Sequence, residues 1–464
     1  MDIQADPLQI RRQKPTNLAL IEGGQSISYG ELCLEVDRMQ RRIDESPPGL
    51  MAIAFSPTID SVVTYLSALA SQRPLVLLEP GSTPANTEWL FRSYDPAIIT
   101  GFTEKPDGFE KAQDLYVRIP DTLVTTPCLC LTTSGSTGSP KLVRLAYSSV
   151  SLNAQCISLA LDINEGSRAI TSLPLNYSYG LSVLNSHLFS GASVVLTTET
   201  ILSRDFWHLF DVAQCTSFAG VPYSYSLLKR LRFSPDDHPS LQVMTQAGGK
   251  LDVTTRQHFH DLLDGYKKQF IIMYGQTEAT ARMSILPHND FLGHEDSAGK
   301  AIPMGSFKIL DELGEDLPPG YEGQIVYQGP NVMDCYVSNV ADFDQSPKCH
   351  GELFTGDRGF LDTDGFLYIT GREKRIGKIH GTRINLDEVE DLIHSDGFIC
   401  AVTNLDEVLH FFFENQTPCD FTPKDLAQKF KVHSSSIKIH RIASLPLLSS
   451  GKVDYPRLEY LISN

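Results

Sequence analysis

Short apolar runs alternate with amphipathic helix patterns through the first two thirds of this 464-residue chain. The predicted strands cover 74–78, 128–131, 192–196, 217–219 and 270–273, and the predicted helices cover 58–71, 149–161, 206–213, 223–231 and 254–263. Apolar runs of this length between helices are typical of strands that are buried on both faces. The alternation therefore predicts stacked βα units around mostly parallel sheets.

The last third of the sequence has a different pattern. From about Phe307 onward, short strand patterns separated by Gly, Pro and Asp predict a β-rich subdomain. Helix-capping residues at Asn385 and Thr422 then alternate with strand patterns and predict a small α+β module. We therefore expect an α/β protein with a large N-terminal domain, 1–371, and a small C-terminal domain, 372–464.

Net charge, cysteine spacing and the lack of targeting patterns argue against several classes of function. The formal net charge of −17 argues against a nucleic-acid partner and against binding to an anionic membrane surface. The nine cysteines form no Cys-x-x-Cys pair, so the spacing typical of a zinc site is absent, and they suit a reducing compartment. The sequence has neither a signal-peptide pattern nor an apolar run of membrane-spanning length, so we expect a cytoplasmic protein.

A hydroxyl-rich stretch lies at 132–141 and reads TTSGSTGSPK. It lies between the predicted strands 128–131 and 142–145. Glycine N–H groups, short hydroxyls and one ammonium can form a flexible cradle for phosphate oxygens. The stretch lacks the Gly-Lys-Ser/Thr triplet of a Walker loop. The alternative is a solvated surface loop of Ser, Thr and Gly.

A second stretch, YGQTE at 274–278, follows a predicted buried strand. It places the Thr277 hydroxyl beside the Glu278 carboxylate at the carboxyl end of that strand, where ligands bind in open parallel sheets. A carboxylate at this edge can hold Mg²⁺, which prefers oxygen ligands and bridges phosphates. The alternative is an ordinary helix start in which Glu278 complements the helix dipole.

Three further stretches carry groups that suit a nucleotide. Asp357, in FTGDRG at 354–359, can accept hydrogen bonds from two ribose hydroxyls, although Gly-Asp turns are common in any protein. The stretch 371–384, GREKRIGKIHGTRI, is basic in an acidic protein; its alternative is a solvated basic loop. Near the C-terminus, PLLSSGKVD places Lys452 on a tight turn, and such Ser-Gly turns are routine.

In this order and spacing, these stretches resemble the adenylate-forming superfamily, which includes acyl-CoA synthetases, adenylation domains of peptide synthetases and firefly luciferases. The resemblance extends from residue 27 to residue 452. It implies a large N-terminal domain, a small mobile C-terminal domain, and ATP and Mg²⁺ as cofactors. The implied reaction joins a carboxylic acid to AMP with release of pyrophosphate, and then transfers the acyl group to a thiol.

The resemblance also implies roles for individual residues. The triphosphate would be held by Thr133, Ser134, Gly135, Ser136, Thr137, Gly138 and Lys141. The α-phosphate would contact Thr277, and Mg²⁺ would bind Glu278. The ribose would contact Asp357 and Arg372. The remaining nucleotide contacts would come from Gly248, Gly249, Lys250, Tyr274, Gly275 and Gln276.

Three lysines would connect the small domain to the two half-reactions. Lys452 matches the lysine that contacts both the carboxylate and the α-phosphate during adenylation, and Lys378 matches the one that faces the site after the small domain rotates. Lys374 occupies the hinge position. The chain departs from the family pattern at Leu142, where a glycine is common, and at Gly377, where an aliphatic residue is usual.

The acid is predicted from the stretch 174–182, PLNYSYGLS, which contains no acidic residue. Peptide-synthetase domains that use amino acids carry an aspartate near this position, so we expect an acid without an α-amino group. The predicted pocket residues are Asn176, Tyr177, Val221 and Pro222. The first two indicate a polar substituent on the acid, or else they only pack or bond to the backbone.

The acceptor thiol is less constrained. We expect CoA, which makes the chain an acyl-CoA synthetase; the alternative is a stand-alone enzyme that loads the phosphopantetheine of a carrier protein. A third reading is a nucleotide-binding regulator that has lost catalysis, and the presence of both Glu278 and Lys452 speaks against it.

Overall fold

The structure is a computed structural model, and it describes residues 6–132, 141–372, 375–379, 382–415, 421–430, 432–448 and 451–463. The predicted phosphate-loop residues 133–138 and the predicted hinge residue Lys374 lie outside the described residues.

One sheet has nine strands. The carboxyl ends of its parallel strands form the edge at which the sequence predicts ligand binding. Its strands are β1 (Leu18–Glu22), β2 (Gln25–Ser28), β10 (Arg168–Ile170), β11 (Ser193–Leu196), β12 (Ser217–Gly220), β13 (Val243–Gln246), β14 (Gln269–Tyr274), β15 (Ser284–Leu286) and β16 (Lys300–Ala301). Their order is β16-β15-β14-β13-β12-β10-β11-β1-β2. The strands from β1 across to β14 pair in parallel. The sheet is nevertheless mixed, because the edge strands β2, β15 and β16 pair antiparallel.

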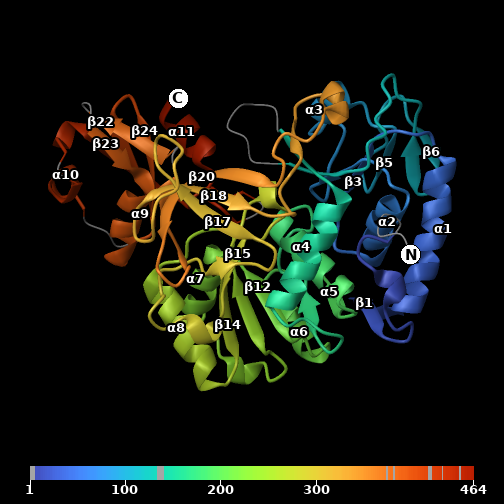
Figure 1. The fold of residues 1–464 in the computed structure, drawn as a ribbon, viewed down its shortest axis with the longest axis horizontal. Coiled ribbons are helices and arrows are strands. Elements are labelled where there is room, and N and C mark those ends of the chain that lie inside the picture. Colours follow the sequence, from blue (N-terminus) through green and yellow to red (C-terminus); the bar gives the residue numbers. More distant parts are fainter. Residues whose placement is uncertain are drawn as a thin grey trace.

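Helices cover both faces of this sheet. On one face lie α4 (Tyr147–Ala160) and α5 (Ser178–Phe189), which also pack against the second large sheet (Figure 1). On the other face lie α6 (Arg204–Val212), α7 (Pro222–Arg230) and α8 (Val253–Gly265). Local sequence sets these starts: Pro222 suits the first turn of α7, and the Asp252 carboxylate caps α8 by accepting the Thr255 N–H at 2.8 Å.

The second large sheet has eight strands, which come mainly from the first third of the chain. They are β3 (Met51–Ala54), β4 (Leu75–Leu78), β5 (Ile98–Thr100), β6 (Glu110–Ala112), β7 (Leu115–Val117), β8 (Leu129–Thr132), β9 (Leu142–Leu145) and β19 (Cys335–Val337). The helices of this part are α1 (Tyr29–Glu45), α2 (Ile59–Ala70) and α3 (Glu88–Tyr94). Strands β8 and β9 pair antiparallel, so the hydroxyl-rich stretch connects two neighbouring strands.

A third sheet confirms the β-rich expectation. Its four strands are β17 (Ser306–Leu310), β18 (Gly323–Gln328), β20 (Glu352–Leu361) and β21 (Leu367–Arg372), and all of them pair antiparallel. In this sheet Asp357 of β20 lies opposite Arg372 of β21. Two residues that are far apart in the predicted motifs are therefore held side by side by backbone pairing.

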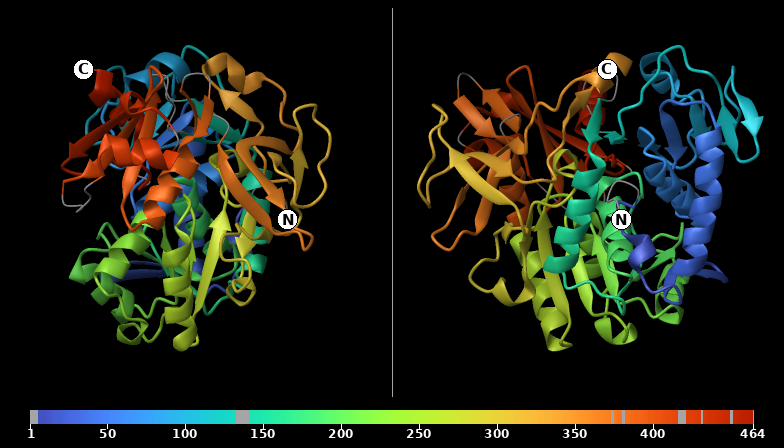
Figure 2. Two further views of the ribbon diagram at one scale, coloured as in Figure 1. Left: turned by 90° about the vertical axis from the view of Figure 1, so that its left-hand side faces the viewer. Right: turned by 45° about the vertical axis from the view of Figure 1, so that its right-hand side comes forward.

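The C-terminal region has apolar clusters of its own, formed by residues from Ile379 onward. Its elements are β22 (Ile376–Ile379), β23 (Thr382–Asn385), α9 (Leu386–Ser395), β24 (Cys400–Leu405), β25 (Val408–Glu414), α10 (Pro423–Phe430), β26 (Ile437–Ile442) and α11 (Tyr455–Ser463). Thr422 begins α10 as predicted, since its hydroxyl accepts the Asp425 N–H at 3.3 Å. The region lies beside the third sheet (Figures 1 and 2). A domain boundary at residue 371 stays a prediction.

Within the described residues, every helix is too short or too polar to cross a lipid bilayer.

Candidate active site

The Asp357 carboxylate lies at the centre of a polar cluster at the carboxyl end of β14. Its Oδ2 accepts hydrogen bonds from Tyr274 Oη at 2.5 Å and from Gln276 Nε2 at 2.7 Å, and its Oδ1 accepts one from Arg372 Nε at 3.0 Å. Asp357 is 2% exposed. Burial, together with the neighbouring carboxylate, raises the pKa of Tyr274 and keeps its phenol protonated as a donor. Four residues predicted to bind the nucleotide therefore form one network.

Thr277 and Glu278 lie directly beside that cluster. They begin η3 (Thr277–Ala279), a three-residue 3₁₀ helix that is too short for a helix-dipole explanation of the glutamate. The Thr277 hydroxyl lies 3.2 Å from Ser178 Oγ, and Glu278 Oε1 accepts a hydrogen bond from Tyr336 Oη at 2.6 Å. The preceding glycine, Gly275, is required here, since a Cβ on it would lie 1.5 Å from the Ala281 carbonyl oxygen.

Lys452 reaches the same end of the sheet from the C-terminal region. Its turn is closed by the Leu448 N–H, which donates to the Lys452 carbonyl at 2.8 Å. The Lys452 ammonium lies 5.8 Å from the centre of the Tyr177 ring. In the same turn Gly451 has φ +77°, and a Cβ on it would lie 2.8 Å from Val221 Cγ2. The turn is thus in contact with the loop that follows β12.

The electrostatic surroundings of Lys452 link it to the polar cluster. Burial and the nearby Arg372 guanidinium lower the pKa of Lys452 to about 8. The carboxylates of Glu278 and Asp357 act in the opposite direction and stabilise the ammonium. The predicted adenylation lysine, the predicted metal ligand and the predicted ribose ligands therefore surround one region.

The loop after β13 completes this region. Gly248 has φ +85°, and a Cβ on it would lie 2.6 Å from Tyr177 Oη and 3.0 Å from Val221 Cγ1. A Cβ on Gly249 would lie 3.2 Å from Pro222 Cγ. The two glycines therefore permit close contact between the predicted nucleotide loop and the predicted acid pocket. Lys250 points elsewhere and forms an ion pair with Asp296 at 3.6 Å.

Asn176, which precedes Tyr177 in the chain, has a buried amide oxygen without a partner among the described residues. The residue is 7% exposed, and its Oδ1 has no hydrogen-bond partner within the described part of the chain. A buried polar atom without a partner costs about 1–3 kcal/mol. The oxygen is therefore suited to accept a hydrogen bond from a bound ligand.

The structure places two further predicted residues by their strands. Lys141 directly precedes β9, and the backbone of Lys378 in β22 lies opposite Arg383 of β23 inside the C-terminal region. Within the residues that the structure describes, no group of three His, Cys, Asp or Glu side chains is suited to hold a metal ion. Glu278 thus stands as a single candidate carboxylate ligand, which suits an Mg²⁺ held mainly by phosphates and water.

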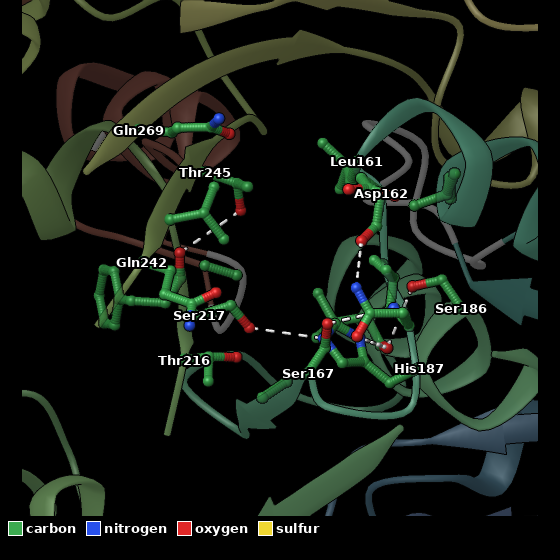
Figure 3. A pocket seen from close by; sticks show the side chains of 18 of the residues that line it. Leu161, Asp162, Ser167, Ser186, His187, Thr216, Ser217, Gln242, Thr245 and Gln269 are labelled. Carbon is green, nitrogen blue, oxygen red and sulfur yellow. Dashed lines mark hydrogen bonds between the residues drawn. The ribbon is translucent and has the colours of Figure 1, made fainter. Parts of the chain in front are cut away.

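A cavity of about 470 Å³ lies along the same sheet, toward the amino ends of β10, β12, β13 and β14 (Figure 3). None of the four predicted pocket residues lines it. Its lining includes the buried Arg282, which lies outside the predicted motifs. Tyr336 and Arg282 were not predicted, because tertiary packing brings each into place and neither lies in a predicted motif. Ser178 lies within the predicted stretch 174–182 but was not predicted as a site residue.

Comparison with known proteins gives independent evidence on the family of this chain. The family described as AMP-binding enzyme matches residues 9–337. The nonribosomal peptide synthetase ataP of Aspergillus terreus is 30% identical over 96% of this chain, which spans only 30% of that protein. The 2-succinylbenzoate–CoA ligase of Bacillus licheniformis is 29% identical, over 95% of this chain and 96% of the ligase.

Among solved structures, the chain is similar to O-succinylbenzoate coenzyme A synthetase (MenE) from Bacillus subtilis in complex with ATP and magnesium ion. The TM-score is 0.78 with 22% identity, over 98% of this chain and 99% of that one. This likeness shows the fold, and the family match covers well over half of the sequence. The resemblance inferred from the motifs is thereby confirmed, and the chain belongs to the AMP-binding enzymes of the adenylate-forming superfamily.

Proposed function

We propose that this chain activates a carboxylic acid with ATP, forming an acyl-adenylate and pyrophosphate, and then transfers the acyl group to the thiol of CoA. One observation carries the proposal: the Lys452 ammonium, delivered by the C-terminal turn, lies against Tyr177 and within electrostatic range of Glu278 and Asp357. Family membership supports the adenylation step. The choice of CoA as the acceptor thiol rests on the sequence and on the similarity to a CoA ligase.

The chemistry requires cations at this position. A carboxylate is a weak nucleophile, and the phosphate it attacks is itself anionic, so their repulsion must be offset where charge accumulates in the transition state. Lys452 supplies a mobile positive charge there. Thr277 supplies a hydroxyl for the α-phosphate. Glu278 would hold Mg²⁺, which would shield the charge of the phosphates.

The nucleoside would occupy the network around Asp357. Ribose hydroxyls would donate to this carboxylate, whose orientation Tyr274, Gln276 and Arg372 already fix. Gly248 and Gly249 allow the loop after β13 to lie close to Tyr177 and Pro222, and the base would lie against that loop. Lys141 and the loop at 133–138 would contact the triphosphate, as the family resemblance implies.

The acid would lie between Tyr177, Val221, Pro222 and the Lys452 ammonium. The Asn176 Oδ1 offers an acceptor to a polar substituent on it. The stretch 174–182 supplies no carboxylate to pair an α-ammonium group. We therefore keep an acid without an α-amino group as part of the proposal.

The thiol step would use the second face of the C-terminal region. A rotation near Lys374 would replace Lys452 with the strand that carries Lys378, so that a phosphopantetheine thiol can attack the carboxyl carbon and release AMP. The domain division at residue 371 belongs to this proposal. CoA and a carrier protein present the same thiol, and the chain is similar to both a CoA ligase and a peptide synthetase.

Acid-dependent ATP–pyrophosphate exchange tests the adenylation step. Propionate and alanine form a matched pair that differs only in the α-amino group, and 2-succinylbenzoate tests the acid named for one relative. We expect exchange with acids that lack the amino group. Exchange with alanine but not with any non-amino acid would overturn the predicted acid class, and no exchange with any acid would overturn the function.

Incubation of the acyl-adenylate with either CoA or a phosphopantetheinylated carrier protein tests the acceptor. Thioester formation on CoA alone is the expected result. Transfer to the carrier protein alone would replace the CoA assignment with the carrier-loading one.

A further inference from the structure

The cavity beside the nine-stranded sheet has the size and chemistry of a ligand site. Its volume of about 470 Å³ falls in the range typical of small-molecule pockets, roughly 300–1,000 Å³. Strands β10, β12, β13 and β14 form one wall, and α4 and α5 form the other (Figure 3). Hydroxyl and amide groups face it from both walls, including Ser217, Thr245 and Ser186.

Arg282 supplies a buried positive charge to this cavity. It lines the cavity and is 1% exposed. Its contacts are with neutral groups: Nη1 donates to Ser182 Oγ at 2.9 Å, Nε lies 3.1 Å from Met273 Sδ, and the guanidinium lies 4.1 Å from the centre of the Tyr179 ring. Within the described residues, no Asp or Glu side chain forms an ion pair with it. Burying a charge without a counter-charge is costly.

The other ionisable groups of the cavity do not compensate this charge. Burial lowers the pKa of His187 to about 4, so its imidazole is neutral at physiological pH. Asp162 and Lys267 also line the cavity, and both lie in surface turns rather than in the interior. An anionic ligand would therefore meet one buried cation.

The cavity lies beside the proposed acid site, because Arg282, which lines it, directly precedes Met283, whose N–H donates to the Tyr274 carbonyl at 2.9 Å. Ala219 also lines the cavity, and Val221 follows it two residues later at the start of α7. Both belong to one buried cluster, against which Tyr177 packs. Tyr179 bridges the two sites, because its ring lies 6.3 Å from the Tyr177 ring and carries the Arg282 guanidinium on its face.

We propose that the acid activated by this chain is an elongated dicarboxylic acid, whose distal carboxylate enters the cavity and is held by Arg282. The proposal rests on the proposed adenylation function. One carboxylate of the substrate reacts beside Lys452. The other supplies the negative charge that Arg282 lacks among the described residues. An acid with an uncharged tail would leave the arginine unpaired and would be used less well.

The test is pyrophosphate exchange with linear diacids from succinate to suberate, each paired with its monomethyl ester. The ester keeps the length and the reacting carboxylate but removes the distal charge. For the best-fitting length we expect kcat/KM to favour the diacid by roughly 100-fold, which is the usual effect of truncating a buried charge partner. An equal kcat/KM for diacid and ester at every length would overturn the proposal.

Arg282→Met sharpens the test, because a methionine fills similar space without charge. The preference for the diacid should disappear, and use of the matched ester should improve. An improvement cannot arise from misfolding, so it reports the site itself. Arg144→Met is the control, since Arg144 is an equally buried arginine outside the cavity, and it should leave the diacid-to-ester ratio unchanged.

Ala219→Val is the second variant and does not remove a charge. It narrows the cavity, so the loss of exchange should grow with the length of the diacid while short acids are spared. Exchange with monocarboxylic acids and an unchanged ratio in Arg282→Met would overturn the dicarboxylate but leave the adenylation function standing. No exchange with any acid would overturn the adenylation function instead.

Discussion

The polar cluster at the carboxyl end of the nine-stranded sheet and the neighbouring cavity differ in how their charges are compensated. In the cluster, Asp357 accepts three hydrogen bonds, Glu278 accepts one from Tyr336, and both carboxylates stabilise the Lys452 ammonium. In the cavity, Arg282 has only neutral contacts among the described residues. The cluster therefore holds charges of both signs before substrate binds, whereas Arg282 has no such counter-charge among those residues. We infer that the cluster sets the reaction and the cavity selects the acid.

A second buried arginine, Arg144, provides a reference for this comparison. Arg144 is also 1% exposed, but it has an ion pair with Asp334 at 3.3 Å, and it donates to the Phe343 carbonyl at 2.6 Å and the Gln345 carbonyl at 2.9 Å. These groups lie directly before β19 and in the segment that follows it, so Arg144 connects distant parts of the chain. An arginine with a structural role is thus paired, and Arg282 differs from it in this respect.

The largest effect is expected at the carboxyl end. Lys452→Ala should lower pyrophosphate exchange by ~10²–10³ for every acid, because it removes one preorganised charge from the transition state. Thioester formation from supplied acyl-adenylate should be spared. The two half-reactions are measured separately, and an equal loss in both would contradict a role confined to adenylation.

The two buried arginines should differ in stability when each is replaced by methionine. Arg144→Met leaves Asp334 and two carbonyls without their partner, so the free energy of unfolding should fall by roughly 3 kcal/mol. Arg282→Met strands no carboxylate and should change stability much less. Denaturant titration of both variants checks this, and an equal loss would show that Arg282 is structural.

Tyr336→Phe tests the support of Glu278. Loss of a hydrogen bond to a charged group should lower exchange by about 10-fold, mainly by raising the Mg²⁺ concentration needed for half-maximal rate. A magnesium titration separates this from a general loss. An unchanged magnesium requirement would argue that the Tyr336 contact does not position the carboxylate.

The smallest effect is expected from pH. Because Lys452 has a lowered pKa of about 8, kcat/KM for exchange should fall as pH rises through that value, where the ammonium loses its proton. Lys452→Arg should move the fall to higher pH. Stability should respond with the opposite sign: the unfolded lysine keeps its proton up to about 10.5, so between these values the contribution of Lys452 to unfolding free energy rises with pH.

Much of the fold could be predicted because its signals are local. Strand β9 was predicted at 142–145 and lies there, and helix α2 begins one residue inside the predicted 58–71. Apolar periodicity, caps and turn residues depend only on nearby sequence. The antiparallel edge strands β15 and β16 were not predicted, since pairing direction depends on partners elsewhere in the chain.

The sequence by itself determined the alternation of strands and helices, the superfamily, and the motif residues that meet around Asp357 and Lys452. Only the tertiary structure decided that Tyr336 supports Glu278 and that Arg282 lies buried beside a cavity without a carboxylate partner among the described residues. The physical reason is that a motif records what a segment carries, whereas burial and charge compensation depend on which distant segments pack against it.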